Sequence, residues 1–197
     1  MITGARAAAV ALFAASMIAS PARPAGAEWG VADLMRSMKA VESSNARFSE
    51  RKELAILSEP LESSGTLIYR APDRLEKHTL VPERASLVLE GDRVVLENAE
   101  RGERKTFSLR EHPAIWALVE SIRSTLSGDL SMLQRFYSVE LEGGEPDWRL
   151  VLRPREPGMK AVIEEIRISG GGTSIARIEI RETGGDRSVM TISRAGS

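Results

Sequence analysis

Residues 61–81 read LESSGTLIYRAPDRLEKHTLV and contain two segments that favour β-strand on either side of a turn. Leu61–Arg70 carries β-branched and aromatic side chains, which pack well on a pleated surface. Ala71–Asp73 has the proline and aspartate typical of a turn, and Arg74–Val81 then alternates until Pro82 stops it. This stretch predicts two consecutive strands of a sheet.

Similar short strands continue toward both ends of the chain. They are Arg47–Leu57, Ala85–Glu90, Arg93–Asn98, Arg104–Leu109, Tyr137–Leu141, Trp148–Arg153, Ala161–Ser169, Ser174–Arg181 and Ser188–Ser193. Turns rich in glycine and proline separate the last five, and no helical pattern lies between them, which predicts an antiparallel meander. The expected fold class is therefore α+β but mostly β, with about ten or eleven strands.

Other segments have helical periodicity. Between Trp29 and Val41, apolar residues recur mostly at spacings of three and four, and this helix is expected to end near residues 43–45. His112–Leu126 is a second amphipathic helix, and Leu130–Phe136 is a further apolar turn or short helix. Each has an apolar face that it must bury, and the sheet is the surface available for this.

The first 27 residues have the pattern of a cleaved secretory signal. Arg6 gives a short basic region, residues 7–20 are small and apolar, and Ala25–Ala27 suits cleavage before Glu28. A buried alanine-rich helix is the less favoured interpretation. We expect residues 28–197 to form one mature, soluble domain in the periplasm, because no later segment is long and apolar enough to cross a membrane.

Composition argues against two classes of partner. Without the two arginines of the signal, 25 lysines and arginines face 28 acidic residues, so the formal charge is −3. A mildly acidic chain offers no broad basic surface for nucleic acid. The chain also contains no cysteine, so we expect neither a disulfide nor a lipid-anchored cysteine after the signal.

The residue types of common catalytic sites are scarce. His78 and His112, the two histidines, lack the spacing of a metal site. No G-x-S-x-G motif occurs, and Gly170–Gly172 is not followed by the helix or Gly-Lys-Ser/Thr of a phosphate loop. Spacing alone does not decide whether folding assembles a Ser–His–Asp triad. The sequence nevertheless predicts no catalytic residue, no metal and no cofactor, and so a protein that is not an enzyme.

A sheet of about ten or eleven strands tends to curl. If it curls without closing, it forms a concave apolar surface that the helical segments could cover. Such a container binds acyl chains without catalytic groups, because each buried methylene contributes about 0.8 kcal/mol. A fully packed core with no cavity is an equally weighted alternative.

Three phrases of the sequence occur in an order known from one protein family. They are NARFSE at residues 45–50, GTLIYRAPDRL at residues 65–75 and the hairpin around Glu90–Asp92. Together they resemble the LolA family of periplasmic lipoprotein carriers, whose members carry F-x-A-x-F-x-Q, G-x-L-x-x-x-R-P-x-x-F and S-D-G-x-x-x-W. The resemblance covers most of the chain after Glu28. It implies an incomplete antiparallel β-barrel in which an N-terminal helix and a mid-chain helical lid cover a hydrophobic cavity.

The resemblance also implies transport without chemistry. Carriers of this family take an acylated protein from an inner-membrane ABC transporter complex and deliver it to an outer-membrane lipoprotein receptor. For this chain, that implies acylated proteins or lipids as ligands, a monomeric state and a role in outer membrane biogenesis. The receptor has the same fold but is itself a lipoprotein, and the missing cysteine argues against that role here.

The chain departs from the family pattern at several positions. The family's Arg-Pro pair becomes Arg70–Pro72 with an alanine between, so the lid-contact arginine of the family corresponds to Arg70 or Arg74. Leu75 replaces an aromatic residue, and Val94–Leu96 lacks the family's tryptophan. These departures indicate a divergent branch that could carry a different lipid, such as a glycolipid or the lipid-linked product of a dedicated pathway.

Alternation along the strands and the apolar stripe of the helices select candidate binding residues. The candidate cavity-lining residues are Leu67, Tyr69, Leu87, Leu89, Val94, Leu96, Leu150, Leu152, Ile178 and Ile180. The candidate lid residues are Ile115, Trp116, Val119, Ile122, Leu126 and Leu133. For each, an ordinary core position is the alternative, because cores and cavity walls use the same residue types.

Two other functions stay open beside the carrier. A sensor of the same fold would bind mislocalised lipid or lipoprotein and act through a protein partner, although known sensors have a second domain, for which the sequence up to Ser197 leaves no room. A hydrolase of lipid-like substrates is the least favoured. A carrier predicts bound lipid without turnover, and a sensor predicts a tight protein partner.

Overall fold

One antiparallel sheet of eleven strands makes up most of residues 29–194, the part of the chain that the computed structural model describes. The strands are β1 (Ser43–Glu53), β2 (Leu61–Arg70), β3 (Arg74–Val81), β4 (Ala85–Glu90), β5 (Arg93–Asn98), β6 (Glu103–Ser108), β7 (Tyr137–Gly144), β8 (Asp147–Pro154), β9 (Ile163–Gly171), β10 (Ser174–Glu182) and β11 (Arg187–Arg194). The predicted signal peptide, residues 1–27, lies outside the described residues.

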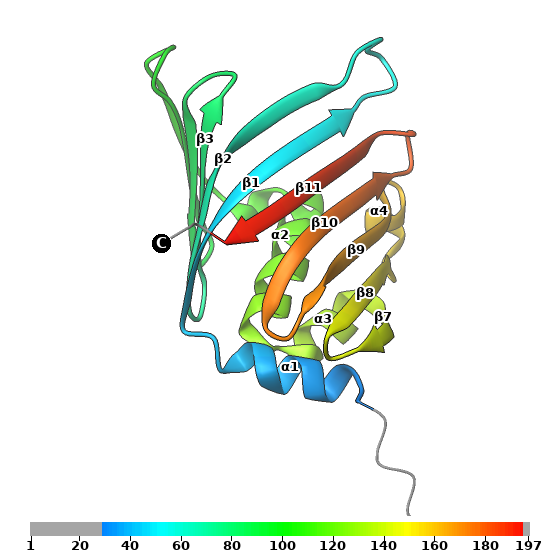
Figure 1. Cartoon of the computed structure of the whole chain (residues 1–197). Helices are drawn as coiled ribbons and strands as arrows, with labels where there is room; N and C mark the ends of the chain where they lie inside the picture. The colour runs from blue at the N-terminus through cyan, green and yellow to red at the C-terminus, as the bar shows by residue number, and fades with distance from the viewer. Residues whose placement is uncertain (1–28, 195–197) are drawn as a thin grey trace, which may run out of the picture.

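The first and last strands are neighbours in the middle of the sheet. Its order is β6-β5-β4-β3-β2-β1-β11-β10-β9-β8-β7, so consecutive hairpins build each half outward from the β1–β11 pair. Figure 1 shows the two halves curling around the helices. Within the described residues β6 and β7 do not pair, which leaves an incomplete barrel. The predicted fold class, mostly antiparallel β with helices on one face, is confirmed.

The boundary between the first helix and the first strand differs from the prediction. Helix α1 spans Val31–Lys39, and β1 begins at Ser43 rather than near Arg47. Ser44 and Asn45 lie opposite β2 in the ladder, and pairing of their backbone with that strand outweighs their preference for turns. β1 also ends at Glu53, because the chain turns over the following residues before β2.

The mid-chain insertion forms two consecutive helices, α2 (Pro113–Ser127) and α3 (Leu130–Phe136). Gly128 ends α2 with a φ of +67°, and a Cβ there would lie 2.1 Å from the carbonyl oxygen of Met35 in α1. Only glycine allows that backbone shape and that approach. Asp129 then caps α3 by accepting a hydrogen bond from the Met132 amide. A short helix α4 (Pro157–Lys160) joins β8 to β9.

The buried side chains form two clusters on the helical side of the sheet. The larger one packs α1 and α3 against β7, β8 and β9, and Trp148 and Leu133 in it are fully buried. The smaller one contains Leu89, Val94 and Leu109. Trp116 of α2 packs against both clusters, so the helix is anchored to both halves of the sheet.

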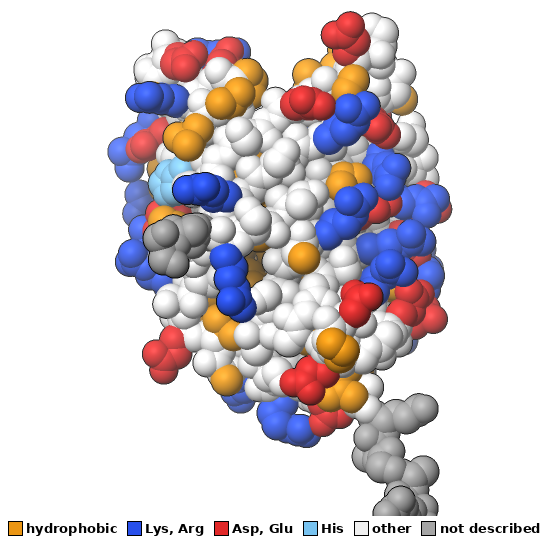
Figure 2. Space-filling view, viewed as in Figure 1, with side chains coloured by type: hydrophobic (Ala, Val, Ile, Leu, Met, Phe, Trp, Pro, Cys, Tyr) orange, Lys and Arg blue, Asp and Glu red, His pale blue; other side chains and the backbone are white. Residues whose placement is uncertain are grey.

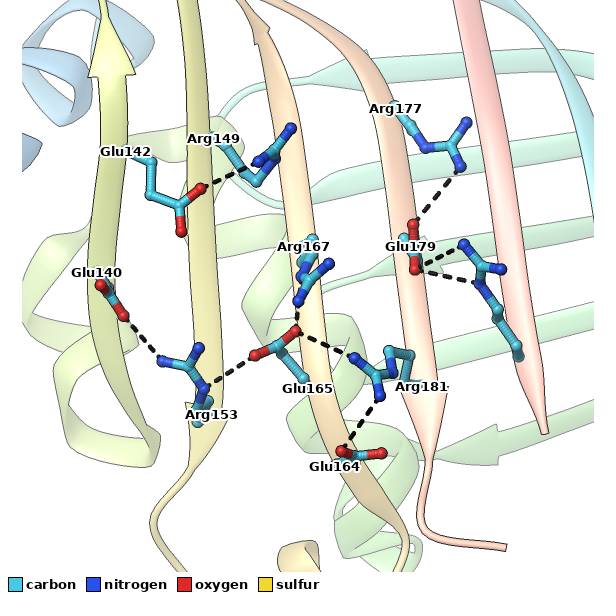
Figure 3. A network of polar contacts seen from close by, with 11 residues as sticks. Glu140, Glu142, Arg149, Arg153, Glu164, Glu165, Arg167, Arg177, Glu179 and Arg181 are labelled. Atoms are coloured by element: carbon cyan, nitrogen blue, oxygen red, sulfur yellow. Dashed lines mark hydrogen bonds and ion pairs between the residues drawn. The ribbon is translucent and has the colours of Figure 1, made fainter. Parts of the chain in front are cut away.

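The opposite, convex face of β7–β11 carries a lattice of ion pairs (Figure 3). The buried Glu165 carboxylate pairs with Arg153 at 2.8 Å, with Arg167 at 2.6 Å and with Arg181 at 3.9 Å. Glu179 pairs with arginines on β10 and β11 in the same way. Alternation along each strand thus separates a charged outer face from an apolar inner one.

Candidate functional site

A cavity of about 600 Å³ lies on the concave face, between the sheet and α2. Its walls come from strands β1–β4, β10 and β11 and from one side of α2. This volume lies within the range of about 300–1,000 Å³ that is usual for sites that bind small ligands. The hypothesis that a fully packed core leaves no space inside is therefore wrong for this face.

Strand register determines which side chains reach the cavity. Tyr69 lies opposite Leu75, which in turn lies opposite Leu89, so these three share one face of β2, β3 and β4. Leu67 pairs in the same way with Lys77 on β3, and Lys77 with Leu87 on β4. All six positions line the cavity, because side chains directly opposite each other in a sheet point to the same side.

The predicted lining residues fall into two groups. Leu67, Tyr69, Leu87, Leu89, Ile178 and Ile180 line the cavity. The other four point to the same face but pack into the cores: Leu150 and Leu152 in the larger one, and Val94 and Leu96 in the smaller one. A ligand-binding role for any of them stays a prediction.

The predicted lid residues also differ in position. Val119, Ile122 and Leu126 of α2 line the cavity, together with Leu118. Trp116 packs edge-on against Phe136 with ring centroids 4.7 Å apart, which joins α2 to α3. Leu133 is fully buried in the larger core, and Ile115 is 47% exposed.

An arginine of the helix itself joins α2 to the sheet. Arg123 donates from Nη1 to the carbonyl oxygen of Gly91, in the β4–β5 turn, at 2.6 Å. It also pairs with Glu120, a carboxylate that is buried on the same helix and accepts a hydrogen bond from Ser124. Charge-assisted bonds of this kind are roughly twice as strong as neutral ones. These bonds of Arg123 hold α2, the helical lid, against the β4–β5 turn.

The arginines selected from the family resemblance lie elsewhere. Arg74 pairs with Glu76 at 2.8 Å and with Glu90 at 3.1 Å, which are both in strands. These bonds raise the pKa of Arg74. Arg70 is exposed at the end of β2. A role for either arginine in handing over a ligand stays a prediction.

A charged cluster that was not among the predicted site residues interrupts the apolar wall. Glu50 of β1 is 6% exposed. Its Oε1 accepts a hydrogen bond from Ser188 at 2.8 Å and lies 3.6 Å from Lys52 Nζ. Its Oε2 accepts hydrogen bonds from Lys77 and, at 3.4 Å, from Ser63. The signal that could have found it is a glutamate two residues after Phe48, on the inward face of a strand.

The environment of Glu50 keeps it ionised. Burial by itself would raise its pKa, but the hydrogen bond and charge of Lys77, with Lys52 and Ser188, outweigh burial. The pKa of Glu50 therefore lies below its ordinary value of 4.5. The Lys77 ammonium also lies 4.7 Å from the centre of the Phe48 ring, a cation–π contact that fixes its position.

One polar atom of the cavity wall lacks a partner. The Tyr69 hydroxyl is buried and has no hydrogen-bond partner among the described residues. Burial, with a smaller contribution from the Asp73 charge, raises the pKa of Tyr69, so the group stays a neutral hydroxyl. It is a donor available to a polar atom of a ligand.

The histidines contribute nothing to the cavity wall. His78 contacts Glu76 at 2.9 Å, and His112 packs edge-on against Phe107 with ring centroids 5.1 Å apart. No group of three or more potential metal ligands occurs in residues 29–194. In the same residues, no helix has the length and apolar character needed to span a membrane.

Comparisons with known proteins give one match over nearly the whole sequence. A family model described as "Outer membrane lipoprotein carrier protein LolA-like" matches residues 7–196. Among curated proteins, none matches this sequence.

Several solved structures are similar to this chain at low identity. A LolA superfamily protein from Nitrosomonas europaea is 8% identical, with 85% of this chain and 94% of that one covered and a TM-score of 0.46. An outer membrane lipoprotein-sorting protein domain from Vibrio parahaemolyticus is 9% identical, with 83% and 88% covered and a TM-score of 0.45. A chain of the MucA/MucB complex of Pseudomonas aeruginosa is 14% identical, with 85% and 58% covered and a TM-score of 0.43.

Proposed function

The chain belongs to the LolA-like family of outer membrane lipoprotein carriers, and we propose that it is a periplasmic carrier of acylated proteins or related lipids. The observation that carries the proposal is the cavity of about 600 Å³ between the sheet and α2. It would hold acyl chains and protect them from water while the protein moves between the two membranes.

The wall of the cavity suits an acyl chain. Leu67, Leu87 and Ile178 are among the apolar side chains on its strands, and Val119 and Ile122 face them from α2. Transfer of about ten methylenes from water to such a wall contributes roughly 8 kcal/mol, since each contributes about 0.8 kcal/mol. Binding of this strength needs no catalytic group, so the proposed activity is transport and not turnover.

The proposed route begins with export. Residues 1–27 would be removed as a signal peptide, and residues 28–197 would form the single lipid-binding domain. In the periplasm the protein would receive its ligand from an inner-membrane ABC transporter complex and release it to an outer-membrane lipoprotein receptor. α2 forms one wall of the cavity, and movement of this helix would widen the cavity for entry and release of the ligand.

Native mass spectrometry of the mature protein purified from the periplasm tests the proposal, with lipid extraction of the same sample. We expect a mass excess that corresponds to an acylated protein or a discrete lipid. A bare chain mass, together with failure to take up a fluorescent acyl probe, would refute a carrier. A protein partner that copurifies in a fixed ratio without lipid would instead favour the sensor.

A variant with a filled cavity sharpens this test. Ile178→Trp places a large side chain on the cavity wall, whereas Ile56→Trp changes a residue that is 90% exposed. The first variant should lose the bound lipid and the second should keep it. Equal lipid content in both would place the lipid outside the cavity.

A further inference from the structure

The cavity has one charged zone in an otherwise apolar wall. Glu50 is six residues beyond Ser44 on the same face of β1, which corresponds to about 20 Å at 3.3 Å per residue. Ala46 and Phe48 are the inward positions between them. The ends of β1, β2 and β3 extend beyond the helices, and Figure 2 shows a notch in the surface there. The charged zone thus lies toward the open end, away from α1.

Three hydrogen bonds and a nearby ammonium leave Glu50 little capacity to accept from a ligand. An ionised carboxylate has about four lone-pair positions. Four side chains already surround this one: Lys77 and Ser63 at Oε2, and Ser188 and Lys52 at Oε1. A cationic group of a ligand would have to displace a partner that the strands hold in place.

The two lysines, in contrast, have donors to offer. An ammonium has three N–H groups, and among the described residues Lys77 donates to Glu50 alone. The Lys77 side chain is 26% exposed and the Lys52 side chain 48% exposed, so a ligand in the cavity can reach both. Two ammonium groups around one carboxylate leave a local excess of one positive charge.

Of the other charged residues of the wall, all but Glu182 have a polar side-chain contact among the described residues. Glu76 pairs with Arg74 and His78, and Arg187 pairs with Glu179. Asp186 accepts a hydrogen bond from the Ala55 amide, and Arg194 donates one to the Ser174 hydroxyl. Arg194 has donors left, but it lies opposite Ala46, toward the α1 end of β1. Lys77 and Lys52 are therefore the cations of the charged zone at the open end.

We infer that the cavity binds amphiphiles with an anionic headgroup, a phosphate or a carboxylate, held by Lys77 and Lys52 while the acyl chain extends toward α2. This inference rests on the proposed function and adds the headgroup class to it. Glu50 acts as a positioning residue, because it holds the Lys77 ammonium above the Phe48 ring and directs it into the cavity.

Binding of three lysolipids with the same palmitoyl chain tests the inference. Lysophosphatidylglycerol is anionic, lysophosphatidylcholine is zwitterionic and monopalmitoylglycerol is neutral. We expect the full mature protein to bind the anionic lipid about tenfold more tightly than the neutral one. One charge-assisted hydrogen bond contributes about the free energy that corresponds to a tenfold difference in affinity. Affinities are measured by displacement of a fluorescent acyl probe at fixed ionic strength and below the critical micelle concentrations.

Charge-removing variants locate the effect. Lys52→Gln removes the more exposed ammonium and leaves Glu50 paired with Lys77, so it should fold and lose part of the preference. Lys77→Gln should weaken binding of the anionic lipid more than binding of monopalmitoylglycerol, and so abolish the preference. Lys160→Gln removes an exposed lysine of α4 and should keep the wild-type preference. Thermal melts confirm that each variant is folded.

The possible results separate the two proposals. Equal affinity for all three lipids would overturn the headgroup inference and leave the carrier standing. Failure of all three to bind would count against the cavity function itself. If millimolar inorganic phosphate displaced the anionic lipid but not the neutral one, the lysines would form a site for free anions, which would overturn the lipid-headgroup assignment.

Discussion

Replacement of Arg123 by methionine tests how the helical lid is held. The change keeps most of the aliphatic stem but removes the bond to the Gly91 carbonyl oxygen, 2.6 Å long, and the pair with buried Glu120. A hydrogen bond to a charged group contributes about 1.5–3 kcal/mol, and a buried carboxylate left without its cation raises the cost to about 3–5 kcal/mol. Since domains are stable by about 5–15 kcal/mol, the variant should fold with a loosened α2.

Hydrogen exchange followed by mass spectrometry measures this loosening directly. Amides in residues 118–127 should exchange faster by at least about tenfold, which corresponds to about 1.4 kcal/mol, while those of β8 and β9 keep most of their protection. The double variant Glu120→Gln/Arg123→Met should lose less stability than Arg123→Met alone, because no unpaired charge stays buried. Urea unfolding gives the global stability for comparison.

Arg74→Met is the matched control, because Arg74 pairs with Glu76 and Glu90 in the sheet. It should leave exchange in α2 unchanged. The reasoning is refuted if Arg123→Met leaves α2 as protected as in the wild type. Faster exchange of α2 in Arg74→Met would show that this arginine holds the lid, as the family resemblance implies.

Three further substitutions test the cavity and the core. Tyr69→Phe should stabilise the ligand-free protein by about 1 kcal/mol in urea unfolding, because its buried hydroxyl has no partner within residues 29–194; a loss of stability would reveal an existing bond. Glu50→Gln should change the pH dependence of stability. The pKa of Glu50 is lowered on folding, so its contribution to the free energy of unfolding is fully present above about pH 4.5 and is lost as the pH falls through the folded pKa. The wild type should therefore lose more stability than the variant between pH 5 and pH 3. Parallel curves of stability against pH would contradict this. Trp148→Ala should lower stability by about 3–5 kcal/mol, because Trp148 is fully buried. The control Ile56→Ala changes a residue that is 90% exposed and should alter stability by less than about 0.5 kcal/mol. Similar melting temperatures for the two variants would refute the assigned core.

The strands could be predicted because their signals are local. β2, β3, β4 and β5 begin and end at the predicted residues, since glycine, proline and aspartate mark their turns. Gly91, for example, has a φ of +58° at the first position of the two-residue turn between β4 and β5. Alternation placed the ten selected residues of β2, β4, β5, β8 and β10 on the concave side, while their contact with a ligand stays a prediction.

The site could be predicted only in part, because it depends on contacts between distant residues. The bond from Ser188 to Glu50 joins positions 138 residues apart, across the β1–β11 pair that brings the first and last strands together in the middle of the sheet. Glu120 and Arg123 have the spacing of an ordinary exposed helical pair, and only packing of α2 against the β4–β5 turn buries them. The position of α2 likewise determines which apolar side chains line the cavity and which pack into the cores.

The Glu50–Lys77 pair is hard to explain by stability alone. A buried ion pair seldom contributes more than well-packed apolar side chains of the same volume would. Strand register does not need it either, since a slip by one residue would already move Phe48, Leu67 and Tyr69 to the outer face. The pair lies in the cavity wall, its carboxylate is surrounded by four side chains and its ammonium still has donors. Binding of an anionic headgroup accounts for all three features, which neither packing nor register does.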